Sequence, residues 1–211
     1  MIDSGVLIFV IIVLFVIWYL NNRNEDMYEH FMAKDAKGGK YMIHMDMPRP
    51  KSAVAKLSKL NAFIVRVIEG MKNRYLHRDD LPTHQAVAQR LVRDYNPGEL
   101  FEQKPNNGTI TSFVTNKGEK VTFCLRDITN YDLHNDHILN FVALHEISHI
   151  GTEGIGHHHE FWRNFRIVLE SAMLDGLHKP KDYRKTPEDY CGKHINYSPL
   201  YDDRLDYVSV L

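Results

Sequence analysis

Two histidines and a glutamate stand close together in the segment Leu144–Gly151, which reads LHEISHIG. His145 and His149 are four residues apart, so on a helix they share one face and can hold one ion. Imidazole nitrogens suit Zn²⁺. Glu146 follows the first histidine, where a carboxylate can take a proton from water and pass it to a leaving amine. The spacing predicts a catalytic site with one zinc ion per chain and Glu146 as the acid/base.

A catalytic zinc site needs a third protein ligand, and GIGHHHEFW, residues 154–162, offers several. The astacin-like pattern is excluded, because its third histidine falls on Ile155. Gly154 and Gly156, on either side of Ile155, let the chain turn back sharply before the three histidines. His157 lies four residues before Phe161, so if Phe161 packs into the core, His157 faces the first two ligands. We expect His157 to be the third ligand; the alternatives are His158, His159, Glu153 and Glu160.

The elements that must position these residues are indicated by apolar periodicity. Apolar residues recur at helical spacing in four segments: 52–75, 81–95, 134–151 and 157–176. The expected caps are Ser52, Thr83 and Asn135 or Asp136, and the expected ends include Gly151 and Gly176. Residues 109–115 and 120–126 are rich in β-branched residues and flank NKGE, which predicts a hairpin. The tail from residue 189 is expected to be irregular. The order of elements predicts an α+β domain.

The N-terminal segment Gly5–Leu20 contains no charged residue and has Trp18 and Tyr19 near its C-terminal end. Such a run predicts an uncleaved single-span helix anchored in the lipid bilayer. Basic residues follow the segment and none precedes it, so the positive-inside bias places the C-terminal domain on the cytoplasmic side. We therefore expect a membrane anchor over residues 1–22, a polar tether over 23–50 and the catalytic domain over 51–211.

Composition narrows the function further. The net charge is −1, from 26 basic and 27 acidic residues, so no specific nucleic-acid partner is expected. The two cysteines, Cys124 and Cys191, are too few for a disulfide-dense secreted scaffold, and we expect reduced thiols. In the tail, Tyr190 and Tyr197 are candidates for polarising a substrate carbonyl; ordinary packing of their rings is the alternative.

HEISH followed by GHHHEFW resembles the zincin superfamily and, in detail, the WLM and SprT-like metallopeptidases. The chain is most similar to small metallopeptidases of that type encoded by large DNA viruses. It shares their CLR strand at Cys124–Arg126 and tail segments at Tyr190–Gly192 and Ser198–Asp202. The resemblance covers about residues 50–205. WLM proteins often have tighter ligand spacing, and cellular members act on proteins crosslinked to DNA; that role does not carry over, because this chain has no separate basic module.

The resemblance implies His145, His149 and His157 as zinc ligands and Glu146 as the acid/base. It also implies a zincin-like fold of helices packed on a small antiparallel sheet, with the HExxH helix and a following helix. An edge strand of that sheet would pair with an extended substrate peptide. In this chain that strand is expected to consist of Thr122, Phe123, Cys124, Leu125 and Arg126.

The expected function is therefore a membrane-anchored zinc metallopeptidase acting on a protein or peptide substrate. The alternative is a structural component of a membrane or of a virion inner membrane, with a zincin-like scaffold and little or no proteolytic activity. Its partners would be viral capsid or membrane proteins. A purely structural zinc site is disfavoured, because such sites have a fourth protein ligand, usually a cysteine. Cys124 or Cys191 could supply this ligand only if the tail folds onto the helix.

Overall fold

The computed structural model of the chain describes residues 7–17, 30–106 and 111–205. Within these ranges five strands form one sheet in the order β1-β2-β3-β5-β4. They are β1 (His30–Lys34), β2 (Lys40–His44), β3 (Leu100–Gln103), β4 (Phe113–Thr115) and β5 (Lys120–Cys124). The pairs β1–β2 and β4–β5 are antiparallel, whereas β3 runs parallel to β2 and to β5. The fold is α+β, but the expected antiparallel sheet is wrong: helices connect β2 to β3, and such a crossover makes strands parallel.

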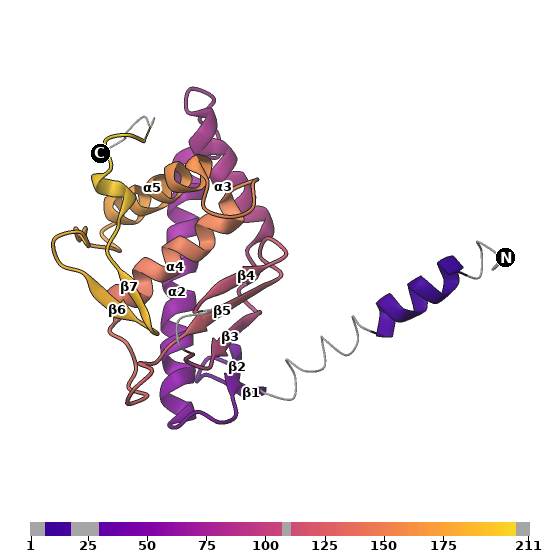
Figure 1. Cartoon of the computed structure of the whole chain (residues 1–211). Coiled ribbons are helices and arrows are strands. Elements are labelled where there is room, and N and C mark those ends of the chain that lie inside the picture. Colours follow the sequence, from indigo (N-terminus) through magenta and orange to yellow (C-terminus); the bar gives the residue numbers. More distant parts are fainter. Residues whose placement is uncertain (1–6, 18–29, 107–110, 206–211) are drawn as a thin grey trace.

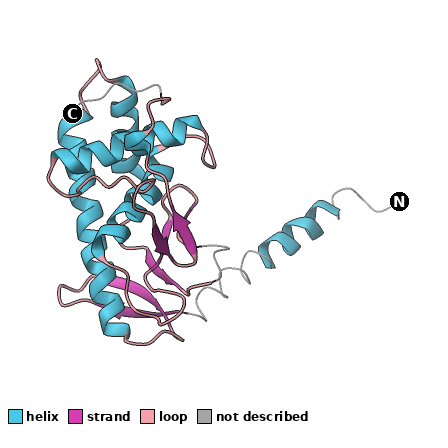
Figure 2. Ribbon diagram, turned by 60° about the vertical axis from the view of Figure 1, so that its left-hand side comes forward, coloured by secondary structure: helices cyan, strands magenta, loops and turns pink. Residues whose placement is uncertain are grey.

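The helices gather beside and above the strands of the sheet (Figure 2). They are α2 (Pro50–Tyr75), α3 (Pro82–Asp94), α4 (Asp136–Gly151) and α5 (His159–Leu174). The chain continues into β6 (Glu188–Tyr190), β7 (Lys193–Ile195) and the short 3₁₀ helix η1 (Pro199–Tyr201). In the view of Figure 1, α4 crosses between the five-stranded sheet and the hairpin β6–β7. The tail that was expected to be irregular therefore contains ordered elements.

Local sequence explains where most helices begin. The side chain of Asn135 accepts a hydrogen bond from the Ile138 N–H at 3.0 Å, so Asn135 is confirmed as the cap of α4. Ser52 and Thr83 are not caps. α2 and α3 begin earlier, with a proline in the first turn, where the missing N–H costs nothing.

The N-terminal helix contradicts the predicted membrane anchor. Its described part covers residues 7–17, and the rest of the segment Gly5–Leu20 lies outside the described residues. Of the described helices, none is both long and apolar enough to cross a membrane. The prediction of a single-pass membrane protein with a cytoplasmic-side domain is therefore wrong.

The predicted polar tether over residues 23–50 contains part of the central sheet. β1 pairs with β2, and β2 pairs with β3. Tyr41 and Ile43 alternate along β2 and are buried, as expected of a strand with one face in the core. The domain boundary predicted at residue 51 therefore falls inside the folded unit.

A disulfide joins Cys124, the last residue of β5, to Cys191 in the turn between β6 and β7. Their Cα atoms are 6.4 Å apart, although 67 positions separate them in the sequence. The prediction of two reduced thiols is therefore wrong, because the tail folds back onto the central sheet. The Tyr190 hydroxyl adds a second attachment by donating to the Cys124 carbonyl at 2.6 Å.

α4 is the most enclosed helix of the domain. It contacts α2, α3, α5 and β4, and its buried residues lie on nearly all of its sides. They are Ile138, Leu139, Phe141, Val142, Ala143, Leu144, Glu146, Ile147, Ser148, Ile150 and Gly151. A helix that is apolar all round belongs in a core. Side chains on α4 are therefore carried by a helix that is enclosed by the rest of the domain.

Candidate metal centre

Three histidines converge at the C-terminal end of α4 and in the loop that follows it. Ring nitrogens of His145, His149 and His157 all lie within 4.8 Å of one another. The Nε2 atoms of His145 and His157 are 2.9 Å apart. His145 and His149 come from successive turns of α4, whereas His157 comes from the loop between α4 and α5. The fold therefore brings together the three residues that the sequence indicated as ligands.

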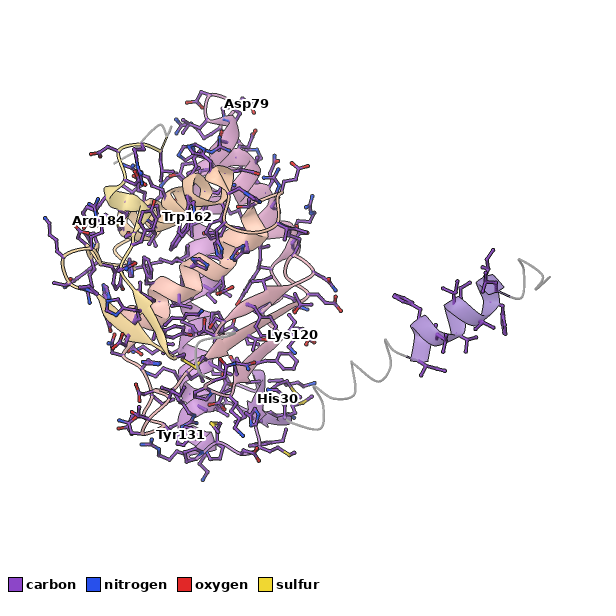
Figure 3. All side chains as sticks on the ribbon, viewed as in Figure 1. His30, Asp79, Lys120, Tyr131, Trp162 and Arg184 are labelled. Carbon is purple, nitrogen blue, oxygen red and sulfur yellow. A yellow bond between two sulfur atoms is a disulfide. The ribbon has the colours of Figure 1, made fainter. Side chains whose placement is uncertain are left out.

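Phe161, in the first turn of α5, contacts all three imidazole rings. Its ring centroid lies 4.9 Å from that of His145, 4.2 Å from that of His149 and 4.7 Å from that of His157. The Phe161 side chain is 1 % exposed. It therefore packs into the core, which is the condition under which His157 was expected to face His145 and His149. Trp162, labelled in Figure 3, stacks on the His157 ring with centroids 5.5 Å apart. Aromatic residues of α5 thus hold the histidine rings from one side.

The three imidazoles are held in the neutral form, which is the form that binds a metal. Burial lowers the pKa of His145 well below its usual value and that of His149 to about 4. Burial also lowers the pKa of His157, although this residue is exposed on one side. Nitrogen ligands around tetrahedral zinc are about 3.3 Å apart. The separations here, from 2.9 Å to at most 4.8 Å, bracket that value, so the donor set fits zinc.

Glu146 stands on α4 between the two helical histidines and is 4 % exposed. Burial raises the pKa of its carboxyl group to about 8. Such a group takes up and returns a proton near neutral pH, and a cation bound beside it favours the charged form. Burial also raises the pKa of Tyr190, and the charge of Glu146 adds to that increase. Glu146 and Tyr190 therefore share one buried region.

The other candidate ligands lie outside the histidine cluster. His158 is the residue before α5, and His159 is the first residue of that helix. Glu153 pairs with Arg90 at 3.1 Å, and the Glu160 carboxylate accepts a hydrogen bond from the Glu153 N–H at 3.4 Å. Among the described residues, the group that could hold a metal consists of the three clustered histidines.

Tyr190 and Tyr197 differ in their access to a substrate. Tyr190 is 2 % exposed, and its hydroxyl contacts the Cys124 carbonyl and, at 2.7 Å, the Ser112 hydroxyl. Tyr197 is partly exposed; its hydroxyl donates to Asp202 at 2.9 Å, and its ring lies edge-on to Trp162 at 4.8 Å. Tyr197 is thus one ring away from His157, whereas the Tyr190 hydroxyl is occupied by the main chain.

The strand expected to pair with a substrate is not an edge strand. β5 has β3 on one side and β4 on the other, and residues Thr122–Arg126 are all buried. Arg126 is paired with Glu102 of β3 at 2.6 Å, and both side chains are fully buried. The prediction is wrong because β3, a strand of four residues, is too short to show a pattern in the sequence. Within the described residues, β4 forms this edge, and it contacts α4.

A surface hollow of about 440 Å³ opens beside the histidine cluster. Trp162 links the two, since it stacks on His157 and also lines the hollow. The lining residues are His159, Trp162, Tyr197, Asp202, Arg204 and Leu205. Within this wall, Arg204 donates two hydrogen bonds to the Asp202 carboxylate and holds its pKa well below the usual range.

Lys117 is a residue near the site that sequence analysis did not indicate. This residue lies in the NKGE turn, which predicted only a hairpin. In the structure its ammonium group reaches the loop that carries His157, where it donates to the Thr152 and Gly154 carbonyls at 2.6 Å each. A lysine inside a turn is a common surface residue, so no local signal marks it.

Comparison with known proteins finds one viral relative and no assigned family. The chain is 30% identical over 97 residues to an uncharacterized protein, R325, of Acanthamoeba polyphaga mimivirus. The match covers 46% of this chain and 49% of that protein, so it spans about half the length of the relative. No protein-family model and no solved structure matches the chain. The chain is thus similar to a viral protein, and this likeness names no activity.

Proposed function

We propose that this protein is a zinc-dependent peptidase. The observation that carries the proposal is the convergence of His145, His149 and His157 at a site open on one side, with Glu146 buried in the same helix. Three protein ligands with one open position are typical of catalytic zinc, whereas structural sites have four protein ligands. Cys124 and Cys191 do not supply a fourth ligand, because their sulfur atoms are bonded to each other.

A zinc ion at these histidines would act as a Lewis acid, polarising a substrate carbonyl and making water nucleophilic at neutral pH. The chain's own residues account for the proton transfer. Glu146 accepts a proton from the attacking water and returns it to the amine that leaves. Its buried position keeps this carboxyl group away from bulk solvent, which would otherwise compete for the proton.

The resemblance of HEISH and GHHHEFW to WLM and SprT-like zincins supports a peptide rather than another acyl substrate. β4 lies at the edge of the sheet and contacts α4, so an extended peptide added beside it would run past the histidines. The hollow beside Trp162 then offers an apolar wall for a substrate side chain.

The decisive experiment separates metal binding from catalysis in the full-length chain. We expect wild-type protein to hold about one zinc ion, His157→Ala to lose it and His158→Ala to keep it. Glu146→Gln should keep zinc but lose peptide hydrolysis by about two decades or more, because only the proton carrier is removed.

Zinc content is measured by elemental analysis and hydrolysis with a quenched fluorescent peptide library. A wild-type chain that binds no zinc and hydrolyses no peptide would refute the proposal and favour the structural alternative. Unchanged hydrolysis by Glu146→Gln would refute the role of Glu146 as the proton carrier.

A further inference from the structure

Lys117 lies in the turn between β4 and β5, and its side chain reaches the end of α4. Its Nζ atom donates to the carbonyls of Thr152 and Gly154 at 2.6 Å and to that of His149 at 3.3 Å. An ammonium group has three donors, so these three contacts use all of them. One of the carbonyls belongs to a residue of the histidine cluster, and another lies three residues before His157.

The end of α4 is a favourable place for this cation. The last carbonyls of a helix have no partner within the helix, and they form the negative end of its dipole. α4 ends at Gly151, and Thr152 is already extended, with φ −109° and ψ 137°. Lys117 therefore binds carbonyls that the change of direction leaves open, and it ties the outgoing loop to the helix end.

The turn itself is built to hold Lys117 in this position. Asn116 and Lys117 are both left-handed, with φ of 46° and 57°, and Gly118 follows with φ of 117°. A Cβ atom on Gly118 would lie 2.3 Å from the Asp94 carbonyl oxygen at the end of α3, so only glycine fits there. The turn is pressed against α3, which fixes the point from which the lysine side chain extends.

Other contacts hold the first part of the same loop. Arg90 of α3 donates to the Gly151 carbonyl at 3.2 Å and pairs with Glu153 at 3.1 Å, and Asn164 of α5 donates to the Thr152 hydroxyl at 3.1 Å. The contacts of Lys117 begin at His149 and reach one residue further along the loop than those of Arg90, to the Gly154 carbonyl. The tip of the loop, at Ile155, is 85 % exposed. The position of His157 therefore depends on how residues 152–154, which precede the tip, are anchored.

We infer that Lys117 is a positioning residue for the metal centre. Its ammonium group fixes the start of the loop 152–158 against the end of α4 and thereby places His157 opposite His145 and His149. The inference rests on the proposed function in one respect, that the histidines bind zinc. The anchoring of the loop itself is independent of any metal.

The test uses the full-length chain with Lys117→Met, which keeps the length of the side chain and removes the charge. Lys117→Arg is the conservative variant. Lys120→Met is the matched control, since Lys120 lies on the same hairpin with its ammonium 4.1 Å from the Phe101 ring centroid (Figure 3). Zinc affinity is measured by chelator competition. Loop opening is measured on metal-free protein as the rate of cleavage at Glu153 by a glutamate-specific protease.

We expect Lys117→Met to weaken zinc binding by roughly 10–100-fold, the usual effect of removing a group that supports a ligand. Cleavage at Glu153 should become about tenfold faster, because hydrogen bonds to a charged group hold the loop closed. Lys117→Arg should recover a large part of both effects, and Lys120→Met should show neither.

Unchanged cleavage at Glu153 in Lys117→Met would overturn the inference, as would cleavage that rises equally at all glutamates, which indicates general destabilisation. Faster cleavage with unchanged zinc affinity would also overturn it, since the loop would then not control the site. A wild-type chain that binds no zinc would refute the proposed function, and the protease result would still decide whether Lys117 anchors the loop.

Discussion

Two hairpins flank α4, and they are attached to the domain in different ways. The hairpin β4–β5 turns at Asn116–Gly118 and sends Lys117 to the carbonyls at the end of α4. The hairpin β6–β7 turns at Cys191 and Gly192, both with positive φ, and is joined to β5 by the disulfide. Both turns use left-handed residues, but one is held by hydrogen bonds that its lysine donates and the other by a covalent bond.

The difference follows from what each hairpin has available for packing. β5 is buried between two other strands, so β4–β5 is stable without a crosslink, and its lysine is free to act on the loop. β6 and β7 have three residues each, and among the strands that the structure describes they pair only with each other. An isolated two-stranded hairpin is marginal in water. The disulfide stabilises the hairpin β6–β7, which has little core of its own. Lys117 acts on the loop that carries His157, where the position of a candidate ligand is set.

The largest effect is expected from removing the disulfide. The double variant Cys124→Ser and Cys191→Ser should lose about 4 kcal/mol of unfolding free energy, since the crosslink closes a loop of 67 residues in the unfolded chain. Urea denaturation measures this loss, and reduced wild-type protein is the control. Zinc affinity should change little. Equal stability of oxidised and reduced protein would end the comparison, because the two attachments would then not differ in function.

A smaller effect concerns pH and His178, which lies in the segment between α5 and β6. Burial, followed by the neighbouring His137, lowers the pKa of His178 from 6.5 to about 4. Between these values the unfolded chain binds a proton that the folded chain does not, so stability falls as the pH falls from 6.5 to 4. The loss from this residue is about 3 kcal/mol.

His178→Phe should reduce this pH dependence in urea denaturation of metal-free protein. Other groups contribute to the remaining dependence, among them His145 and His149, whose pKa values burial also lowers. At pH 6.5, zinc should stabilise the variant as much as the wild type, because His178 is outside the metal centre. An unchanged slope between pH 6.5 and 4 in His178→Phe would show that this histidine is not kept neutral by the fold.

The smallest effect is expected for Tyr190→Phe. The variant loses the hydrogen bond to the Cys124 carbonyl, which should cost about 1 kcal/mol of stability. Peptide hydrolysis should fall by less than about tenfold, because the Tyr190 hydroxyl is bonded to the Cys124 carbonyl and to the Ser112 hydroxyl and is not turned to a substrate. The rates of peptide hydrolysis by Tyr190→Phe, Tyr197→Phe and the wild type are measured and compared. A loss of two decades in Tyr190→Phe would show that its hydroxyl acts on the substrate and not only on the hairpin.

Local periodicity was sufficient to predict the half of the site that lies on one helix. Helix geometry alone sets the relative positions of His145, Glu146 and His149. Asn135 marks the start of that helix. His157 was also predicted, because Phe161 begins an apolar stripe whose facing direction is set within one turn of α5. The structure brings the three histidines together, and the sequence could indicate this because each relation joins residues within a few positions of each other.

The tertiary structure decided everything that joins distant parts of the chain. The disulfide of Cys124 and Cys191, the insertion of β3 beside β5 and the contacts of Lys117 with the end of α4 have no period in the sequence. Residue types and spacing thus determined the candidate chemistry of the site. The contacts that hold the site residues in place form only when the chain folds. The burial and the orientation of a side chain depend on all the elements that pack around it.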